Sequence, residues 1–395
     1  MTACDPAASP ASPTPPTGLE LAVQPDILKL FVQDLRWRGV VGEDRAAKLL
    51  YLALTSRLLD RPVSVAVKGP SSAGKSWVTD AVLDFFPPRA YYKLTAMSEK
   101  VLVYSEEPVQ HRHLVINEAS GLGGEFASYV IRSLLSERRL IYETVERPPR
   151  GGQWRSRRIE REGPTGLITT TTAIRIHPEN ETRLLSIRVN DTREQTRTIM
   201  REFARKAAGG VPANRVDLRP WHEFQEALAE KEHRVVIPYA RALADKIPPV
   251  AVRLRRDFGS LLALIAAHAL LHQATRQKTR DGVIVADLAD YAAVRPLVAD
   301  LMAEGADLSV PDTVRQTVHA VESLISSGPE HVTAAAVAGR LNLDPSTAWR
   351  RIQTALDLGY LGNLEEERSR PGRLVLGNPL PREQELLPAA DRLQA

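Results

Sequence analysis

The sequence predicts an α/β protein in which a parallel sheet is followed by a helical region. Three observations carry this prediction. Short β-branched or apolar runs alternate with helix-compatible segments between residues 63 and 190, which is typical of a parallel sheet with crossover helices. A glycine-rich octapeptide joins the first of these runs to the helix after it. From 222 to 305 the apolar residues keep helical spacing throughout.

Composition describes an ordinary globular chain. Of the 395 residues, 43% are hydrophobic and 25% are charged, and the formal net charge is +4. This length suits two or three domains of roughly 100–200 residues each. Residues 1–18 form a Pro/Ser/Thr/Ala tail without the features of a signal peptide, and no run of 18 apolar residues occurs. We therefore expect a disordered tail, a cytoplasmic location and no membrane partner. The single cysteine, Cys4, excludes disulfides within the chain and a cysteine zinc site.

The order of the predicted segments divides the chain into parts. Residues 19–60 are predicted to form helices, because their apolar positions recur at spacings of three and four. An α/β core is expected over 61–221 and a helical region over 222–308. The segment 309–378 has the pattern of a helix, a turn, a second helix and a hairpin. A tail at 379–395 follows.

The octapeptide GPSSAGKS fits the phosphate-loop pattern G-x-x-x-x-G-K-[ST], with a strand-like run before it and a helix-compatible run after it. The glycines let successive backbone N–H groups face one concavity, and the helix start adds its positive dipole end. Lys75 is expected to reach the β- and γ-phosphates, and Ser76 to hold Mg²⁺. The motif therefore predicts binding of ATP or GTP, and we take ATP with Mg²⁺ as the expected pair. The residues expected around the nucleotide are Gly69, Pro70, Ser71, Ser72, Ala73, Gly74, Lys75, Ser76 and Trp77.

A carboxylate suited to hydrolysis ends the apolar run LVINE. Hydrolysis needs a group that positions or activates water near the γ-phosphate, and Glu118 is the candidate. Asn117 stands where many ATPases carry an aspartate associated with Mg²⁺. Its amide is able to orient a metal-bound water but brings no charge. The alternative interpretation of Glu118 is an acidic residue in a loop before a helix.

Arginines gather in one predicted turn. The segment 147–158, RPPRGGQWRSRR, contains five arginines, no acidic residue and a Gly-Gly pair, so we expect a hairpin over 139–161. Guanidinium forks match phosphates, and an aromatic ring stacks on a base, which makes DNA the expected partner. A solvated surface loop is the alternative. The residues expected to contact DNA are Arg147, Arg150, Trp154, Arg155, Arg157 and Arg158.

Taken in order, these segments resemble the AAA+ ATPases, and within them the clade with a hairpin before the sensor 1 strand, which includes the minichromosome-maintenance (MCM) helicases and their relatives in phages and mobile elements. The resemblance covers residues 65–300. SLLSERRLIYETVER is similar to the helix that rises into the hairpin. GLITTTT is similar to the sensor 1 strand, where Thr171 or Thr172 would replace the family's asparagine. A run of threonines is also simply good strand sequence.

The resemblance assigns roles to arginines after this strand. NETRLLSI is similar to the arginine-finger segment, which implies Arg183. VRLRRDFGSLLALIAAHALL is similar to the lid helix that the sensor 2 arginine opens, and the apolar spacing favours Arg256 over Arg253 and Arg255. A surface ion pair for Arg183 and a solvated basic face for the other three are the structural alternatives.

Residues 309–378 resemble a winged-helix domain. Its second helix, STAWRRIQTALDLG, would carry Arg350 and Arg351 into a major groove while the wing touches the backbone. Winged helices also bind proteins, so this alternative stays open. The implied fold is an AAA+ phosphate-loop core with a parallel sheet, a helical lid and a C-terminal winged-helix domain.

The function implied by the resemblance is an ATP-dependent DNA helicase or translocase of the replication type. It would form a homohexameric ring around single-stranded DNA, with duplex DNA at the winged helix. Catalysis by Lys75, Ser76 and Glu118 would need Arg183 from the neighbouring subunit. A non-translocating AAA+ switch or helicase loader is the main alternative, and a small-molecule kinase is a third. The arginine-rich hairpin favours the motor.

Overall fold

The structure is a computed structural model. The residues that it describes are 17–118, 124–146, 153–172, 183–209, 216–305, 311–328, 331–365, 372–380 and 386–393. No helix in this part of the chain has the length and apolar character needed to cross a membrane.

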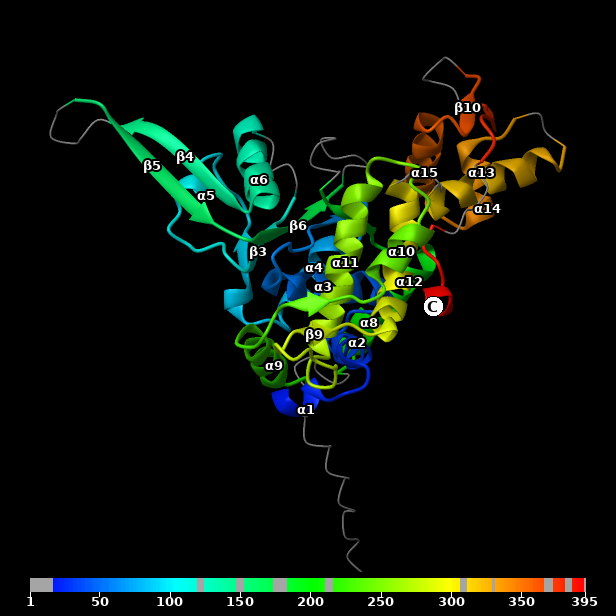
Figure 1. The fold of residues 1–395 in the computed structure, drawn as a ribbon. Helices are drawn as coiled ribbons and strands as arrows, with labels where there is room; N and C mark the ends of the chain where they lie inside the picture. Colours follow the sequence, from blue (N-terminus) through cyan, green and yellow to red (C-terminus); the bar gives the residue numbers. More distant parts are fainter. Residues whose placement is uncertain are drawn as a thin grey trace, which may run out of the picture.

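Five parallel strands form the central sheet, in the order β2, β3, β6, β1, β7 (Figure 1). The predicted α/β class with a parallel sheet is confirmed. β1 has β6 on one side and β7 on the other, so the loop that follows β1 leaves the interior of the carboxyl edge. The bounds of the strands are β1 (Val65–Lys68), β2 (Tyr91–Leu94), β3 (Arg112–Ile116), β6 (Thr165–Thr171) and β7 (Leu185–Arg188).

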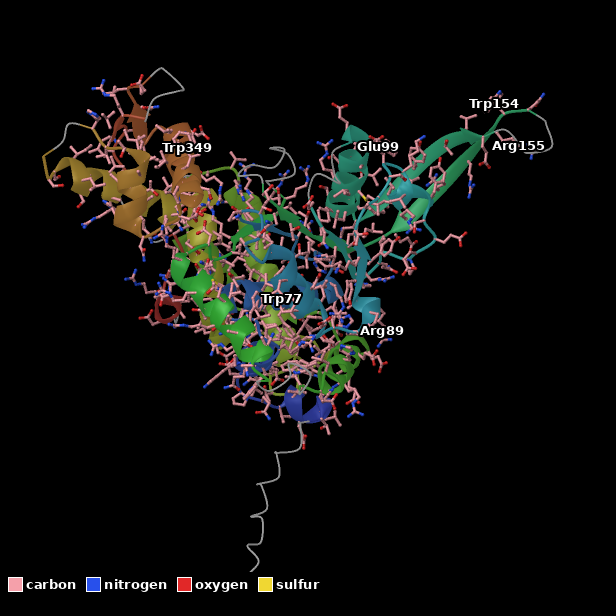
Figure 2. All side chains as sticks on the ribbon, turned by 180° about the vertical axis from the view of Figure 1, so that it is seen from behind. Trp77, Arg89, Glu99, Trp154, Arg155 and Trp349 are labelled. Carbon is pink, nitrogen blue, oxygen red and sulfur yellow. The ribbon has the colours of Figure 1, made fainter. Side chains whose placement is uncertain are left out.

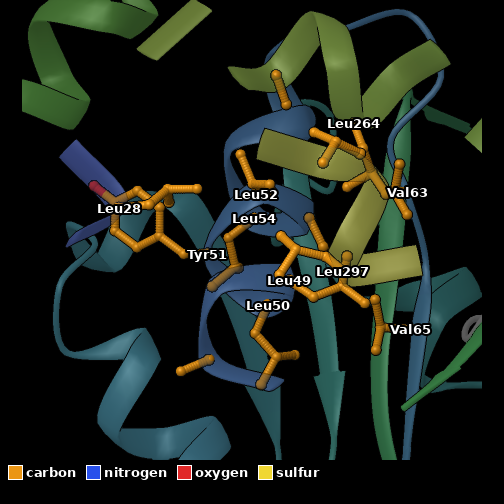
Figure 3. Close-up of a cluster of buried hydrophobic side chains, with 14 of the residues drawn as sticks. Leu28, Leu49, Leu50, Tyr51, Leu52, Leu54, Val63, Val65, Leu264 and Leu297 are labelled. Carbon is orange, nitrogen blue, oxygen red and sulfur yellow. The ribbon is translucent and has the colours of Figure 1, made fainter. Parts of the chain in front are cut away.

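The N-terminal helices complete the main core rather than standing apart from it. Helix α3 (Asp44–Thr55) is apolar on almost every face and is buried between the sheet and later helices. Its side chains Leu49, Leu50 and Leu52 pack in one cluster that also includes residues of α11 and α12, among them Leu264 (Figure 3). Each such leucine contributes about 1.5–3 kcal/mol through burial. The other N-terminal helices are α1 (Gly18–Ala22) and α2 (Ile27–Trp37).

The helices between the strands and the hairpin follow the predicted order. Three helices belong to this part, α4 (Lys75–Leu83), α5 (Val101–Tyr104) and α6 (Glu125–Glu137). After α6, β4 (Arg139–Glu146) and β5 (Arg155–Glu162) pair antiparallel and project away from the body of the molecule (Figure 1). Arg161 anchors the base of this hairpin by donating to the carbonyl oxygens of Ser105 and Glu107.

The second half of the described chain is mainly helical. Its α-helices are α8 (Arg193–Ala207), α9 (Arg219–Ala229), α10 (Ala240–Lys246), α11 (Leu254–Leu271), α12 (Leu288–Gly305), α13 (Asp312–Ile325), α14 (Ala334–Leu341) and α15 (Pro345–Asp357). Two short strand pairs accompany them, β8 (Val235–Val236) with β9 (Ile284–Val285), and β10 (Leu361–Asn363) with β11 (Leu374–Leu376). Short 3₁₀ turns occupy Ser56–Leu58, Pro88–Ala90 and Ala390–Leu393. Helices α13 to α15 and β10 to β11 share a separate core cluster.

Two buried histidines lie within this framework. His113 on β3 is fully buried, and its Nε2 is 3.0 Å from the Val63 carbonyl oxygen. A Cβ at Gly166 would lie 2.2 Å from that same nitrogen, so the glycine makes room for the ring. His272, which follows α11, is 3% exposed, and its ring centroid lies 4.7 Å from that of His268. Burial, joined at His272 by the charge of the neighbouring His268, lowers the pKa of both rings from 6.5 to about 4.

These pKa shifts predict loss of stability at mildly acidic pH. Between pH 6.5 and 4 the unfolded chain binds more protons than the folded one, so the free energy of unfolding falls as the pH drops, by on the order of 2 kcal/mol per histidine. Urea unfolding at pH 7, 5.5 and 4.5 measures this. His113→Gln and His272→Gln should each make the dependence shallower, whereas the exposed control His319→Gln should not. If the free energy of unfolding depends on pH equally in the wild type and in all three variants, the two buried histidines are not the cause.

Candidate nucleotide-binding site

The phosphate loop runs from the end of β1 to the start of α4 and is held against its neighbours. Gly69 donates its N–H to the carbonyl oxygen of Thr171 at 3.3 Å. A Cβ at Gly69 would come within 2.4 Å of the Val189 side chain, so only glycine allows this approach. Gly74 takes a φ of 84° at the N-cap of α4, where no side chain caps the helix. The first N–H groups of α4 are therefore left open to an anion.

Lys75 is the buried cation of the loop. It is 9% exposed, and its Nζ donates to the Pro70 carbonyl oxygen at 2.6 Å. Burial lowers its pKa, Glu118 opposes this, and the positive charge of Arg350 lowers the pKa further. The lysine thus faces one acidic and one basic side chain from distant parts of the chain.

Asn117 and Glu118 follow β3 at the same edge of the sheet. Glu118 has a φ of 64° and donates its backbone N–H to Thr170 Oγ1 at 3.0 Å, while its side chain is exposed. Asn117 Oδ1 is buried and makes no hydrogen bond within the described part of the chain. A buried amide oxygen of this kind needs a partner, and a metal-bound water would satisfy it.

The threonines at the end of β6 divide their roles. Thr170, which the sequence did not single out, is the one that holds the backbone of Glu118. Thr171 is buried and accepts from Gly69 through its carbonyl oxygen. Thr172 lines the same cavity as the start of the phosphate loop. The two predicted sensor 1 candidates therefore both lie beside the loop.

Several other residues predicted to contact the nucleotide are exposed to solvent. Ser71, Ser72 and Ser76 are exposed. Trp77 is 55% exposed, and Lys206 of α8 places its Nζ 5.8 Å from the centre of the indole ring. In Figure 2 Trp77 is seen over the central part of the molecule, away from the hairpin.

One cavity adjoins the loop, and a second lies next to the first. A small one of about 110 Å³ lies between the phosphate loop, the end of β7 and helix α15. A larger one of about 420 Å³ shares part of this wall and extends to Glu43 and to α12. Burial raises the pKa of Glu43 to about 7, although its Oε1 accepts from the Asn190 N–H at 2.9 Å. The residues that line both cavities are Arg188, Val189, Asp191, Thr313 and Arg351.

Arg183 and Arg256 lie together, but beside α6. Arg183 donates from Nε to Ser136 Oγ at 3.0 Å. Its pKa is lowered by burial and then by the charges of Arg256 and Arg132. Three guanidinium groups from different elements therefore gather here. The charged groups that shift the pKa of Lys75 are Glu118 and Arg350 instead.

The two arginines predicted for a DNA-recognition helix occupy an unexpected place. Both are on α15, and both line the small cavity beside the phosphate loop. Arg351 is 7% exposed and forms a 2.6 Å ion pair with Asp191. Contrary to the prediction of DNA contact, its side chain is not available at the surface. Nothing in the local sequence signals this pairing, because Asp191 lies far away along the chain.

The described hairpin residues carry both signs of charge. Trp154 is 68% exposed at the far end (Figure 2). Arg157 pairs with Glu146 at 3.4 Å, and Arg158 with Glu160 at 2.5 Å. On β4 and β5 five arginines face four glutamates, so their net charge is +1. Two of the predicted DNA contacts, Arg147 and Arg150, lie outside the described residues.

The order of the sheet strands decides the fold, together with the positions of the loop and the carboxylate. The phosphate loop follows β1, the acidic residue follows the strand two places away, and the polar end of β6 lies between them. The fold is a phosphate-loop α/β fold built on a five-stranded parallel sheet.

Comparisons with known proteins give matches in structure but none in sequence. Neither a protein-family model nor a curated protein sequence matches the chain. A full-length MCM homolog from Methanopyrus kandleri aligns with 14% identity and a TM-score of 0.49, covering 77% of this chain and 63% of that one. NtrX from Brucella abortus, in complex with ADP or ATP, aligns with 14% identity and TM-scores of 0.29 and 0.28 over 83% of this chain and 71% or 72% of its own.

Proposed function

We propose that the chain binds ATP at the phosphate loop and hydrolyses it. The observation that carries this proposal is the placement of Lys75 and Glu118 at the carboxyl edge of one sheet, after β1 and β3, with the Glu118 backbone bonded to Thr170 on the strand between them. The loop supplies N–H donors and one buried cation for the phosphates.

The proposed reaction divides the work between these side chains. Glu118 accepts a proton from a water molecule, whose oxygen attacks the γ-phosphorus. The bond from this phosphorus to the bridging oxygen breaks, and its electrons leave with ADP. Lys75 stabilises the charge that develops on the phosphate oxygens. Thr170 holds the backbone of Glu118 and so positions its carboxylate.

Mg²⁺ fits the same edge of the sheet. The hydroxyl of Ser76 is exposed at the start of α4, and the unpartnered Oδ1 of Asn117 is suited to a metal-bound water. The ion supplies neutralisation of phosphate charge and orientation of the phosphate oxygens. We propose that these two residues hold it.

We further propose that Arg183 acts on the nucleotide of a neighbouring subunit in a homohexameric ring, with Arg256 as its partner. The charges of Arg256 and Arg132 both act on Arg183, so a phosphate at this place would interact favourably with several guanidinium groups. Because they gather beside α6 rather than near Lys75, a phosphate brought by a second copy of the chain is the anion proposed. Hydrolysis would then require assembly.

The finer proposal is a DNA helicase or translocase of the MCM type, with single-stranded DNA at the hairpin. It is supported by the projection of β4 and β5 from the body (Figure 1) and by the exposed Trp154 at the far end. Arg155, Arg157 and Arg158 would contact the phosphate backbone, together with Arg147 and Arg150. The exposed ring would stack on a base.

A second candidate is a non-translocating AAA+ switch or helicase loader. It is favoured by the position of α15 beside the phosphate loop, because the C-terminal region, which we propose to be a winged helix, would then respond to nucleotide. The four glutamates on β4 and β5 also weaken attraction to DNA phosphates. Strand separation distinguishes this candidate from the motor.

Lys75→Ala is expected to abolish nucleotide binding, whereas Glu118→Gln should keep ATP bound and slow turnover by roughly 10²–10⁴-fold. The lysine contacts phosphates in the ground state, and the carboxylate acts on water. Calorimetric ATP binding and steady-state turnover separate the two effects. Lys93→Ala is the matched control, since this lysine pairs with Asp80 at 2.7 Å on α4. Normal turnover by Glu118→Gln would exclude its role.

Arg183→Ala should bind ATP and lose roughly 10³–10⁵-fold in turnover. Mixed with Lys75→Ala protein, it should regain activity, because about a quarter of the interfaces in an equal random mixture combine an intact pocket with an intact arginine. Turnover of the mixture measures the recovery. Arg219→Ala, which removes a surface arginine paired with Asp217, is the control. No recovery despite proven subunit exchange would place Arg183 outside the neighbour's site.

Replacing Arg150, Arg155, Arg157 and Arg158 by alanine should leave basal ATP hydrolysis nearly intact and remove its stimulation by DNA. The slope of log affinity against log salt should flatten by roughly 0.7–0.9 for each phosphate that no longer meets an arginine. Unwinding of a forked duplex is the deciding measurement. If the wild type unwinds and the quadruple variant does so equally well, the hairpin is not the translocating element.

The hairpin glutamates provide the opposite control. Glu143, Glu146 and Glu160 are opposed to or paired with arginines on this hairpin. Their joint replacement by glutamine should strengthen DNA binding and steepen its salt dependence. If the wild type separates no strands under any tested condition, the switch or loader becomes the better assignment.

A further inference from the structure

Helix α15 forms one wall of the cavity beside the phosphate loop. The opposite wall is the start of the loop, with Lys68, Gly69 and Pro70, and the end of β6 at Thr172. The α15 side chains that face it are Arg350, Arg351 and Thr354. With a volume of about 110 Å³ the cavity is small, so these side chains lie close to the loop.

Arg351 fixes α15 to the core. Its Nη2 is 2.6 Å from Asp191 Oδ1, in the segment between β7 and α8. The side chains are only 8% and 18% exposed, so each charge depends on the other. Arg351 Nη1 also donates to Gln316 on α13 at 3.4 Å. The ion pair therefore joins the C-terminal helices to the edge of the central sheet.

Further contacts hold the same two parts together. Arg193 at the start of α8 donates to Asn342 Oδ1 at 3.0 Å. Arg188 at the end of β7 donates to Thr313 Oγ1 on α13 at 3.2 Å. All of these core residues lie within one short stretch, 188–193. The position of α15 is thus set by several polar bonds rather than by a single one.

Arg350 brings a second cation to the loop. Its Nη2 donates to Thr347 Oγ1 at 3.1 Å, which keeps the guanidinium on the cavity side of α15. Its charge acts on Lys75 strongly enough to contribute to the lowered pKa of that lysine. Arg350 on the cavity wall and Lys75 in the loop therefore bring two interacting cations to the phosphate loop, an arrangement suited to an anion. The phosphate groups reached by Lys75 are the anion expected at this place.

We propose that Arg350 binds the terminal phosphates of the nucleotide in the same chain, and that the Arg351–Asp191 pair holds α15 in position for this contact. The inference rests on the proposed binding of ATP by the phosphate loop. It assigns the C-terminal helices a part of the nucleotide site in place of the DNA contact predicted from the sequence. It also makes Arg350 distinct from Arg183, which is proposed to act between subunits.

The arrangement links nucleotide binding to docking of the C-terminal helices. A ligand that contacts both α15 and the phosphate loop binds the docked state more tightly than the undocked one. The two effects are reciprocal. If nucleotide binding favours docking of α15 by a given factor, release of α15 lowers the affinity for the nucleotide by the same factor. Bound ATP should therefore protect α15, and loss of the γ-phosphate should weaken that protection.

The first experiment measures ATP and ADP affinity by calorimetry with the full chain and Mg²⁺. Arg350→Ala should lower the affinity for ATP by roughly 10- to 100-fold, the effect of losing a charge-assisted hydrogen bond. Its affinity for ADP should fall less. Arg350→Lys should recover part of the affinity. Arg340→Ala is the matched control, since Arg340 bonds Ser323 elsewhere in the C-terminal helices, and it should bind as the wild type does.

The second experiment measures hydrogen exchange across residues 345–357 with and without ATP. In the wild type ATP should slow exchange of α15, whereas Arg350→Ala should exchange equally fast in both conditions. Arg351→Ala should exchange faster than the wild type even without nucleotide and should also bind ATP more weakly. Because exchange reports local opening, it separates undocking of α15 from global unfolding.

The outcomes distinguish this inference from the proposed function. If the wild type binds ATP and Arg350→Ala binds it with the same affinity, the present inference is wrong and the ATPase proposal stands. Absence of ATP binding by the wild type overturns both. Loss of DNA binding in Arg350→Ala, with ATP affinity intact, overturns the inference in favour of the DNA contact.

Discussion

The close contact between the phosphate loop and the ends of its two neighbouring strands is the constraint on which the site depends. Gly69 bonds the end of β6 through its N–H, and it lacks the Cβ that would collide with Val189 after β7. This contact brings the end of β6, with Thr172, and the segment after β7, with Asp191, to the loop. Parallel pairing then adds Glu118, because β3 ends next to β6. A side chain at position 69 would move the loop away from both neighbours at once.

Charge pairing separates two kinds of arginine in the molecule. On the hairpin, Arg157 and Arg158 have glutamate partners, so much of their charge is balanced locally. Near Lys75 the charges of both Glu118 and Arg350 act on the lysine, and near Arg183 the charges of Arg256 and Arg132 act on the arginine. Repulsion between cations costs free energy in the folded chain, and an anionic ligand would offset the cost. The candidate nucleotide contacts therefore stand out through electrostatics, whereas the hairpin stands out only through its composition and its projection.

What the sequence predicted well is what contiguous residues encode. The phosphate loop, the strand that precedes Asn117 and Glu118, and the α/β class each depend on short patterns with a defined local geometry. The role of Thr170 was missed because four successive threonines carry no signal of which one meets a neighbouring strand. Arg351 was predicted to contact DNA, and this prediction failed for a different reason. The pattern of its helix is the same whether the helix faces solvent or packs on the core, and its partner Asp191 is set only by long-range packing.

The contacts of the two proposed phosphate-binding arginines would depend on different events. Arg183 gathers with Arg132 and Arg256 away from its own phosphate loop, so its contact with nucleotide would depend on the neighbouring subunit. Arg350 faces the loop of its own chain, so its contact would depend on docking of α15. A nucleotide held by both would require assembly and docking together. Loss of the terminal phosphate would weaken both contacts, and the free energy released could move the C-terminal helices, the subunit interface, or both. In this proposal the C-terminal helices would be coupled to hydrolysis through the nucleotide and not through the hairpin.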